Sequence, residues 1–145
     1  MSRYEPADSF ETPRFSDVRT FMRLPNTRDL PNADAAIVGA PFDMGATFRA
    51  GARFGPEGIR SASHLLRRYN TSLDVAIFDH LSVIDYGDVP VVPGYIEESY
   101  QRIEHGLEIV CLHRYDHAQI TALLAANVAH KFLSLLAFSK KTGSM

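Results

Sequence analysis

The residues best suited to chemistry lie in one glycine-rich stretch near the start of the chain. Within residues 41–60 an acidic side chain, Asp43, is followed closely by Arg49 and Arg53. Charge-assisted hydrogen bonds between such groups can tie a loop together. Glycines and prolines let the stretch turn tightly, and we assign this structural role to Gly39, Pro41, Gly45, Gly51, Gly55 and Pro56.

The stretch follows a short apolar run, and in open α/β sheets ligands bind beyond the carboxyl ends of strands. A nucleotide is not favoured as the ligand. The spacing of Gly45, Gly51 and Gly55 fits neither the dinucleotide-binding pattern nor the P-loop, and no lysine follows.

The order of residues in this stretch resembles the N-terminal signature of the ureohydrolase superfamily, specifically its agmatinase branch. The family pattern is Pro-x-Asp-x-Gly, then Arg-x-Gly-x-Arg-x-Gly-Pro-x-x-Ile-Arg, and residues 41–45 and 49–60 follow it. Residues 85–89 resemble the family's second-strand motif. The resemblance covers about residues 34–105.

The resemblance implies hydrolysis of a guanidino group, such as agmatine to putrescine and urea, in polyamine metabolism. A hydroxide bridging two manganese ions performs this reaction in the family. The resemblance also implies an oligomer, and it makes Asp43, Arg49 and Arg53 candidate substrate-loop residues.

The family's three metal-binding motifs are not intact in the sequence. They are Gly-Gly-Asp-His, Asp-Ala-His-x-Asp and Asp-x-Asp-x-x-Asp-Pro, and the nearest candidate, residues 114–117, lacks both glycines. Residues 115–129 instead resemble the start of the last agmatinase helix, and residues 108–110 the strand before it. We therefore interpret the chain as the front part and the back part of an agmatinase-like sequence, joined near Gly106. No catalytic residue or metal ligand is assigned, and manganese is not expected to bind productively.

Three other groups of residues each allow a functional interpretation and a purely structural one. His113, Asp116 and His117 are close enough for a lone metal site, but solvated residues at a helix start are favoured. Cys111 is favoured as a buried, inert thiol. An arginine-rich stretch binds an anion or, as we favour, forms a solvated helix face with loop-tying arginines; it comprises Arg49, Arg53, Arg60, Arg67 and Arg68.

Apolar periodicity predicts strands near 34–39, 81–86 and 107–112, and helices near 56–68, 95–106 and 117–138. This alternation indicates an α/β fold with a parallel sheet flanked by helices, a truncated version of the three-layer ureohydrolase fold. On the first helix we expect Ile59, Ser63 and Leu66 to be buried. We expect water to contact the opposite face, formed by Arg60, His64, Arg67 and Arg68.

The length of 145 residues suits one domain. We divide the chain into an N-terminal arm (1–32), a single α/β domain (33–138) and a tail (139–145). The arm either docks through the apolar cluster Phe15, Val18, Phe21, Met22 and Leu24 or is a mobile terminus.

Composition excludes several classes of function. A net charge of −2 gives no support for binding nucleic acid or an anionic membrane. The most apolar tract, residues 123–138, is too short and too polar to span a bilayer. One cysteine and an N-terminus without an apolar core indicate an intracellular, cytoplasmic protein.

Two functional hypotheses follow. The chain is an agmatinase-family protein that is inactive in this form, or it is a non-catalytic partner of itself or of a full-length agmatinase-like subunit. We also expect marginal stability or self-association, because a shortened parallel sheet leaves strand edges unpaired.

Overall fold

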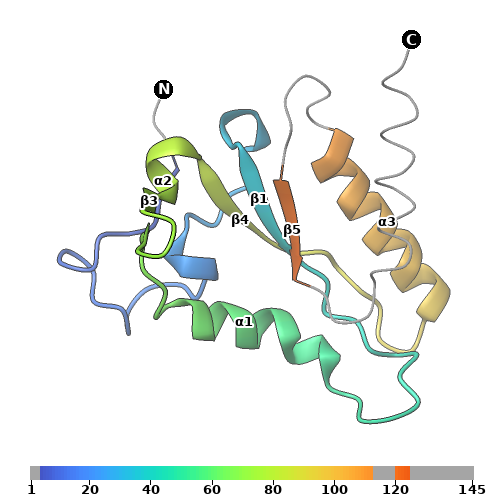
Figure 1. The fold of residues 1–145 in the computed structure, drawn as a ribbon. Coiled ribbons are helices and arrows are strands. Elements are labelled where there is room, and N and C mark those ends of the chain that lie inside the picture. The colour runs from blue at the N-terminus through green and yellow to red at the C-terminus, as the bar shows by residue number, and fades with distance from the viewer. Residues whose placement is uncertain (1–3, 113–119, 125–145) are drawn as a thin grey trace.

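A three-stranded parallel sheet organises the chain (Figure 1). The computed structural model describes residues 4–112 and 120–124. Strand β1 (Ala35–Gly39) lies between β4 (Val83–Asp88) and β5 (Ile120–Leu124), and both neighbours run parallel to it. All of β1 is buried, as expected for a central strand covered on both faces. The predicted fold class and the first two predicted strands are confirmed.

One face of the sheet packs against helix α3 (Ile96–Leu112). Ala36 and Val38 of β1 and Ile84 of β4 contribute to this apolar cluster. The helix contributes three residues spaced four and three apart, Ile103, Leu107 and Val110. This spacing places the three side chains on one side of a helix.

The other face packs against shorter elements. Ala35, Ile37 and Val83 form a second cluster with Leu24 and with Phe78 of helix α2 (Ile77–His80). Helix α1 (Gly55–Ser63) lies beside the 3₁₀ helix η1 (Phe21–Arg23). Four further short elements complete the described residues: the 3₁₀ helices η2 (Leu30–Asn32) and η3 (Ala52–Phe54), and the strands β2 (Tyr69–Asn70) and β3 (Val75–Ala76), which form an antiparallel pair.

The N-terminal arm lies along the outer edge of β4. The amide of Val83 donates to the carbonyl of Tyr4 at 3.0 Å, and that of Asp85 donates to Pro25 at 3.0 Å. The amide of Thr27 donates back to the Asp85 carbonyl at 3.2 Å. Of the apolar cluster expected to dock the arm, Leu24 is buried and Phe21 and Met22 are partly buried, whereas Phe15 and Val18 are exposed.

The strand predicted over 107–112 is wrong, because these residues form the last part of α3. The apolar run Leu-Glu-Ile-Val-Cys-Leu looked like a buried strand, but Leu107 and Val110 continue the helical spacing that begins at Ile103. The helix passes through Gly106 without a break. A Cβ at Gly106 would lie 2.5 Å from Cγ1 of Val89, so glycine allows the close approach of α3 to Val89.

The helix predicted over 117–138 is wrong where the structure describes it. Residues 120–124 form β5 and pair in register with β1, from Ala35 opposite Ile120 to Gly39 opposite Leu124. The pairing with a buried strand outweighs the helical apolar periodicity of this segment. The other residues of that predicted helix lie outside the described part of the chain, as does the tail.

The predicted faces of the first helix are wrong in part, although Arg67 and Arg68 are exposed as expected. Arg60 and His64 are buried, whereas Ile59 and Leu66 are exposed; Ser63 is buried as expected. The helix ends at Ser63, five residues before its predicted end at 68. The face of α1 that points toward the sheet is therefore polar, because Arg60 binds the carboxylate of Asp85 there.

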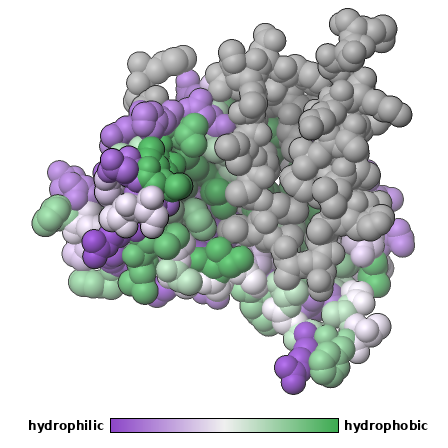
Figure 2. All heavy atoms as spheres, in the orientation of Figure 1, coloured by the Kyte–Doolittle hydropathy of each residue, from purple (hydrophilic) through white to green (hydrophobic). Residues whose placement is uncertain are grey.

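Among the described residues, no helix is long and apolar enough to cross a membrane. Figure 2 shows hydrophobic and hydrophilic residues interspersed over the coloured part of the visible face.

Candidate functional site

The loop between β1 and α1 leaves the sheet at the carboxyl ends of β1 and β4. These ends are adjacent, since Gly39 pairs with Asp88. The loop extends from residue 40 to 54 and projects from the body of the molecule at the lower right of Figures 1 and 2. This edge is where open α/β sheets bind ligands, so the loop is the candidate site.

Asp43 holds the two ends of this loop together. The Arg53 side chain binds Oδ1 of Asp43 through Nε at 2.6 Å and Nη2 at 2.5 Å. The amide of Gly51 donates to Oδ2 at 2.7 Å. The hydrogen bond from Arg53 holds the pKa of Asp43 below its ordinary value, against the opposing effect of desolvation. Asp43 therefore remains an anion that closes the loop.

Arg49 lies apart from this pair. Its guanidinium carbon lies 5.2 Å from the ring centroid of Phe48, and both residues are exposed. The backbone of Arg49 has φ of 51°, a conformation that non-glycine residues rarely adopt. Of the three candidate substrate-loop residues, the structure thus joins Asp43 to Arg53 and leaves Arg49 at the surface.

The glycines predicted to shape the loop have different surroundings. Gly51 has φ of 144°, which excludes most side chains. A Cβ at Gly39 would lie 1.9 Å from Oδ1 of Asp88 and 3.0 Å from Cβ of Pro56. A Cβ at Gly45 or Gly55 would meet no atom of the described residues within 4 Å.

The two prolines flank the loop. Pro41 is half-buried where the chain leaves β1. Pro56 is buried in the first turn of α1, where its missing N–H needs no helical partner.

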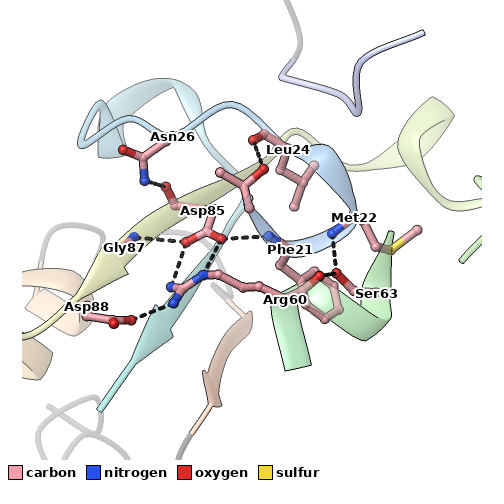
Figure 3. Close-up of polar contacts among 10 residues, drawn as sticks. Phe21, Met22, Leu24, Asn26, Arg60, Ser63, Asp85, Gly87 and Asp88 are labelled. Atoms are coloured by element: carbon pink, nitrogen blue, oxygen red, sulfur yellow. Dashed lines mark hydrogen bonds and ion pairs between the residues drawn. The ribbon is translucent and has the colours of Figure 1, made fainter. Parts of the chain in front are cut away.

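A buried ion-pair network beneath the loop was missed by the sequence interpretation (Figure 3). Arg60 donates to both carboxylate oxygens of Asp85, at 2.7 and 2.9 Å, and to Asp88 at 2.6 Å. Asp85 is fully buried and also accepts from the amides of Phe21 and Gly87. The network thus connects α1, β4 and the N-terminal arm.

A β-bulge directs Asp85 toward Arg60. Ile37 lies opposite Asp85 but Val38 lies opposite Gly87, so the register shifts at Tyr86. Gly87 has φ of 88°, which lets the chain bend at this point. The signal in the sequence was Asp85 at the end of an apolar run, since a buried carboxylate requires a cationic partner.

The network also sets the charge of Arg60. Burial disfavours its cationic form, but hydrogen bonds from the guanidinium to Asp85 and Asp88 outweigh that effect and raise the pKa of Arg60 above its ordinary value. The guanidinium is therefore a permanent cation that ties the helix to the sheet.

The residues that the structure describes do not fit a dinuclear manganese site. No three of their His, Cys, Asp or Glu side chains come close enough to hold a metal ion. The three carboxylates near the loop, Asp43, Asp85 and Asp88, each bind an arginine instead. His113, Asp116 and His117 lie outside the described residues.

A profile of the arginase family matches residues 33–114, more than half of the chain. The chain belongs to the arginase family. The matched range includes the loop, the ion-pair network and all of α3. Neither the match nor the helix ends at the junction predicted near Gly106.

Relatives of this arginase-family chain are longer than it is. It is 41% identical over 115 residues to a guanidinobutyrase of Pseudomonas aeruginosa, a match that covers 72% of the chain and 36% of the relative. A hypothetical agmatinase from Burkholderia thailandensis superposes with a TM-score of 0.77 at 29% identity, over 97% of the chain and 43% of the other. The chain therefore spans less than half of these proteins.

A third relative carries the family's metal. The structure of Trypanosoma cruzi formiminoglutamase with Mn²⁺ superposes on the arginase-family chain with a TM-score of 0.54 at 27% identity, over 72% of the chain and 35% of the relative. Manganese thus occurs in this family.

Proposed function

We propose that this chain carries the substrate-loop portion of an agmatinase-type guanidino hydrolase and that, by itself, it does not catalyse the reaction. The observation that supports the proposal is the loop over residues 40–54. It is closed by the Asp43–Arg53 pair at the carboxyl ends of β1 and β4 in an arginase-family chain. The reaction of the complete enzyme is hydrolysis of a C–N bond of a guanidino compound to an amine and urea.

The loop contributes by binding one class of substrate and repelling another, and it does not transfer protons. Because the Asp43 carboxylate is engaged by Arg53 and by the Gly51 amide, it acts as a clamp and not as a general base. Arg49 and Phe48 are exposed at the surface of the loop. A cation there attracts the carboxylate of a guanidino acid and repels the ammonium group of agmatine. We therefore favour a guanidino acid as substrate of the complete enzyme, in line with the guanidinobutyrase relative.

The proposed inactivity of the isolated chain is supported by its sequence. The family's three metal-binding motifs are not intact in it, and the carboxylates beside the loop are neutralised by arginines. Manganese, when bound in the family, activates water for attack on the guanidino carbon. The chain's own described residues would not hold it.

Urea release tests the proposal directly. The purified chain is incubated with manganese and either 4-guanidinobutyrate or agmatine, with an intact agmatinase as the positive control. We expect no urea from the chain alone. Calorimetric titration with manganese should give no tight binding, and two tightly bound ions per chain or turnover of either substrate would overturn the inactivity.

The alternative role is that of a non-catalytic subunit. It is supported by large apolar side chains exposed just before and just after α1, among them Phe54, Leu65 and Leu66. Such residues occur at protein interfaces. Co-sedimentation of the chain with an intact agmatinase, with and without substrate turnover, separates this role from that of a solitary domain.

A further inference from the structure

A pocket of about 440 Å³ lies between the N-terminal arm and the residues that follow α1. It is separate from the loop over residues 40–54. Its lining is strongly basic, since four arginines contribute to it: Arg14, Arg23, Arg67 and Arg68. Asp8 is the one carboxylate among the described residues that line it.

Arg23 is the unusual member of this lining, and Arg60 provides an internal comparison. Both residues are 8% exposed. Arg60 binds the carboxylates of Asp85 and Asp88. Arg23 has only neutral acceptors in the described part of the chain, the hydroxyl of Ser9 at 3.1 Å and the carbonyl of Thr12 at 2.7 Å. A buried guanidinium without a counter-charge is unfavourable.

The backbone holds Arg23 in this position. Met22 and Arg23 have φ of 51° and 62°, a conformation that is unfavourable for side chains of this size. The amide of Met22 donates to Oγ of Ser63 at 2.7 Å, and the amide of Ala7 donates to the carbonyl of Arg23 at 3.1 Å. The strained turn is therefore fixed from both α1 and the arm, and it keeps the cation inside.

Two polar atoms in the wall of the pocket have no hydrogen-bond partner among the described residues. They are Nε of Arg23 and Nε2 of His64, both shielded from solvent. His64 is 9% exposed, and its Nδ1 lies 3.3 Å from the carbonyl of Arg14, which can only accept. Unpartnered buried polar atoms are rare and call for an explanation.

The acidic residues nearby do not neutralise the pocket. Glu5 is paired with Arg68 at the surface. Asp8 accepts a hydrogen bond from the amide of Phe10 at 2.9 Å. Arg14, Arg23 and Arg67 remain without an ion pair among the described residues, so the pocket carries an excess of positive charge.

We propose that this pocket binds an oxyanion, namely the phosphate or carboxylate group of a small molecule. Arg23 supplies the buried counter-charge. Arg14 and Arg67, both exposed, contact the anion at the mouth of the pocket. Guanidinium groups form paired hydrogen bonds with either anion, which explains why arginines rather than lysines line the pocket.

Binding is measured by calorimetry on the complete chain, with inorganic phosphate in one series and acetate in another. Ionic strength is held constant with sodium chloride. We expect saturable binding of at least one anion. Binding of phosphate alone identifies a phosphate-bearing ligand, and binding of acetate alone a carboxylate-bearing one.

Three variants assign the binding to the pocket. Arg23→Gln should weaken it by about tenfold or more, equivalent to about 1.4 kcal/mol. Arg67→Gln removes an exposed charge at the mouth and should weaken it by a smaller factor. Arg102→Gln, the matched control, removes an exposed arginine on α3 and should leave the affinity unchanged.

A second measurement guards against misfolding of the Arg23 variant. In the unsubstituted chain, the side-chain Nε–H signal of Arg23 should shift in the ¹⁵N NMR spectrum as the anion is added. If Arg23→Gln fails to fold, this signal and the affinity of Arg67→Gln decide whether the anion binds in the pocket. No saturable binding of either anion, or equal affinity in the Arg67 and Arg102 variants, would overturn the proposal.

Discussion

Arg60 and Asp85 join helix α1 to strand β4 of the sheet through two parallel hydrogen bonds, at 2.7 and 2.9 Å. The pair is closed off from water, since Asp85 is fully buried and Arg60 is 8% exposed. Asp88 binds the same guanidinium from a more exposed position, with 41% of its side chain accessible. The two carboxylates therefore make different contributions to stability.

Replacing Asp85 by Asn should destabilise the chain strongly. The change keeps the side-chain shape but leaves Arg60 without its buried counter-charge, and breaking such a pair costs about 3–5 kcal/mol. Asp88→Asn is the matched control and should cost no more than about 1 kcal/mol, because that pair is partly exposed. Urea denaturation measures both. Equal losses in the two variants would contradict the assigned roles.

Gly39→Ala should also be destabilising, because the new Cβ would collide with the Asp88 carboxylate and press on Pro56. Overpacking of this kind costs about 1–3 kcal/mol. Gly45→Ala, in the loop that follows β1 and with open space around the new Cβ, should change the free energy of unfolding by less than about 0.5 kcal/mol. Thermal melting of the two variants provides the comparison, and a G45A variant as unstable as G39A would refute the packing argument.

Acid should weaken the loop closure made by Asp43. Its pKa is lowered in the folded state from the ordinary value of 3.8, mainly by the hydrogen bond from Arg53. The stabilisation is therefore fully present above that ordinary value and is lost as the pH falls through the lower, folded pKa. Unfolding free energies of the unsubstituted chain and of Asp43→Asn, measured from neutral to acidic pH, should converge in acid. A constant difference across the range would show that the carboxylate charge is not involved.

Self-association is expected at micromolar concentration, driven by exposed apolar residues around α1. Phe54 and Leu65 are 68% and 76% exposed. Converting both to Ser should shift sedimentation velocity toward the monomer. Tyr95→Ser, which removes a side chain that is 66% exposed on the approach to α3, is the control. A chain that sediments as a monomer and melts sharply without any substitution would refute both self-association and the partner role.

The sequence permitted the prediction of β1, β4 and the loop at their carboxyl ends, because short apolar runs bounded by glycine and proline have few structural alternatives. Helix α3 was predicted too short, since an apolar run such as residues 107–112 suits a buried strand and a helix equally. Strand β5 was not predicted because it depends on pairing with β1, which is distant in sequence.

Candidate site residues were predicted in part. The Asp43–Arg53 pair lies within a single loop, so the nearness of the two residues in the sequence made the contact predictable. The Arg60–Asp85 pair joins residues far apart in the chain, and a helical arginine looks solvent-facing until its partner is known. Pocket-lining Arg23 owes its burial to a strained turn that no sequence pattern indicated.

The course of the arm along β4 has a consequence for how the chain misfolds. Residues 4–27 supply hydrogen-bond partners on the outer side of that strand, at Val83 and Asp85. Proteolytic removal of the arm would leave these amide and carbonyl groups unmatched, forming a template for a strand from another molecule. Nicking between Phe10 and Phe15, both almost fully exposed, would release the segment that contains Tyr4 and so free the Val83 amide, while the contacts of Pro25 and Thr27 with Asp85 stay in place.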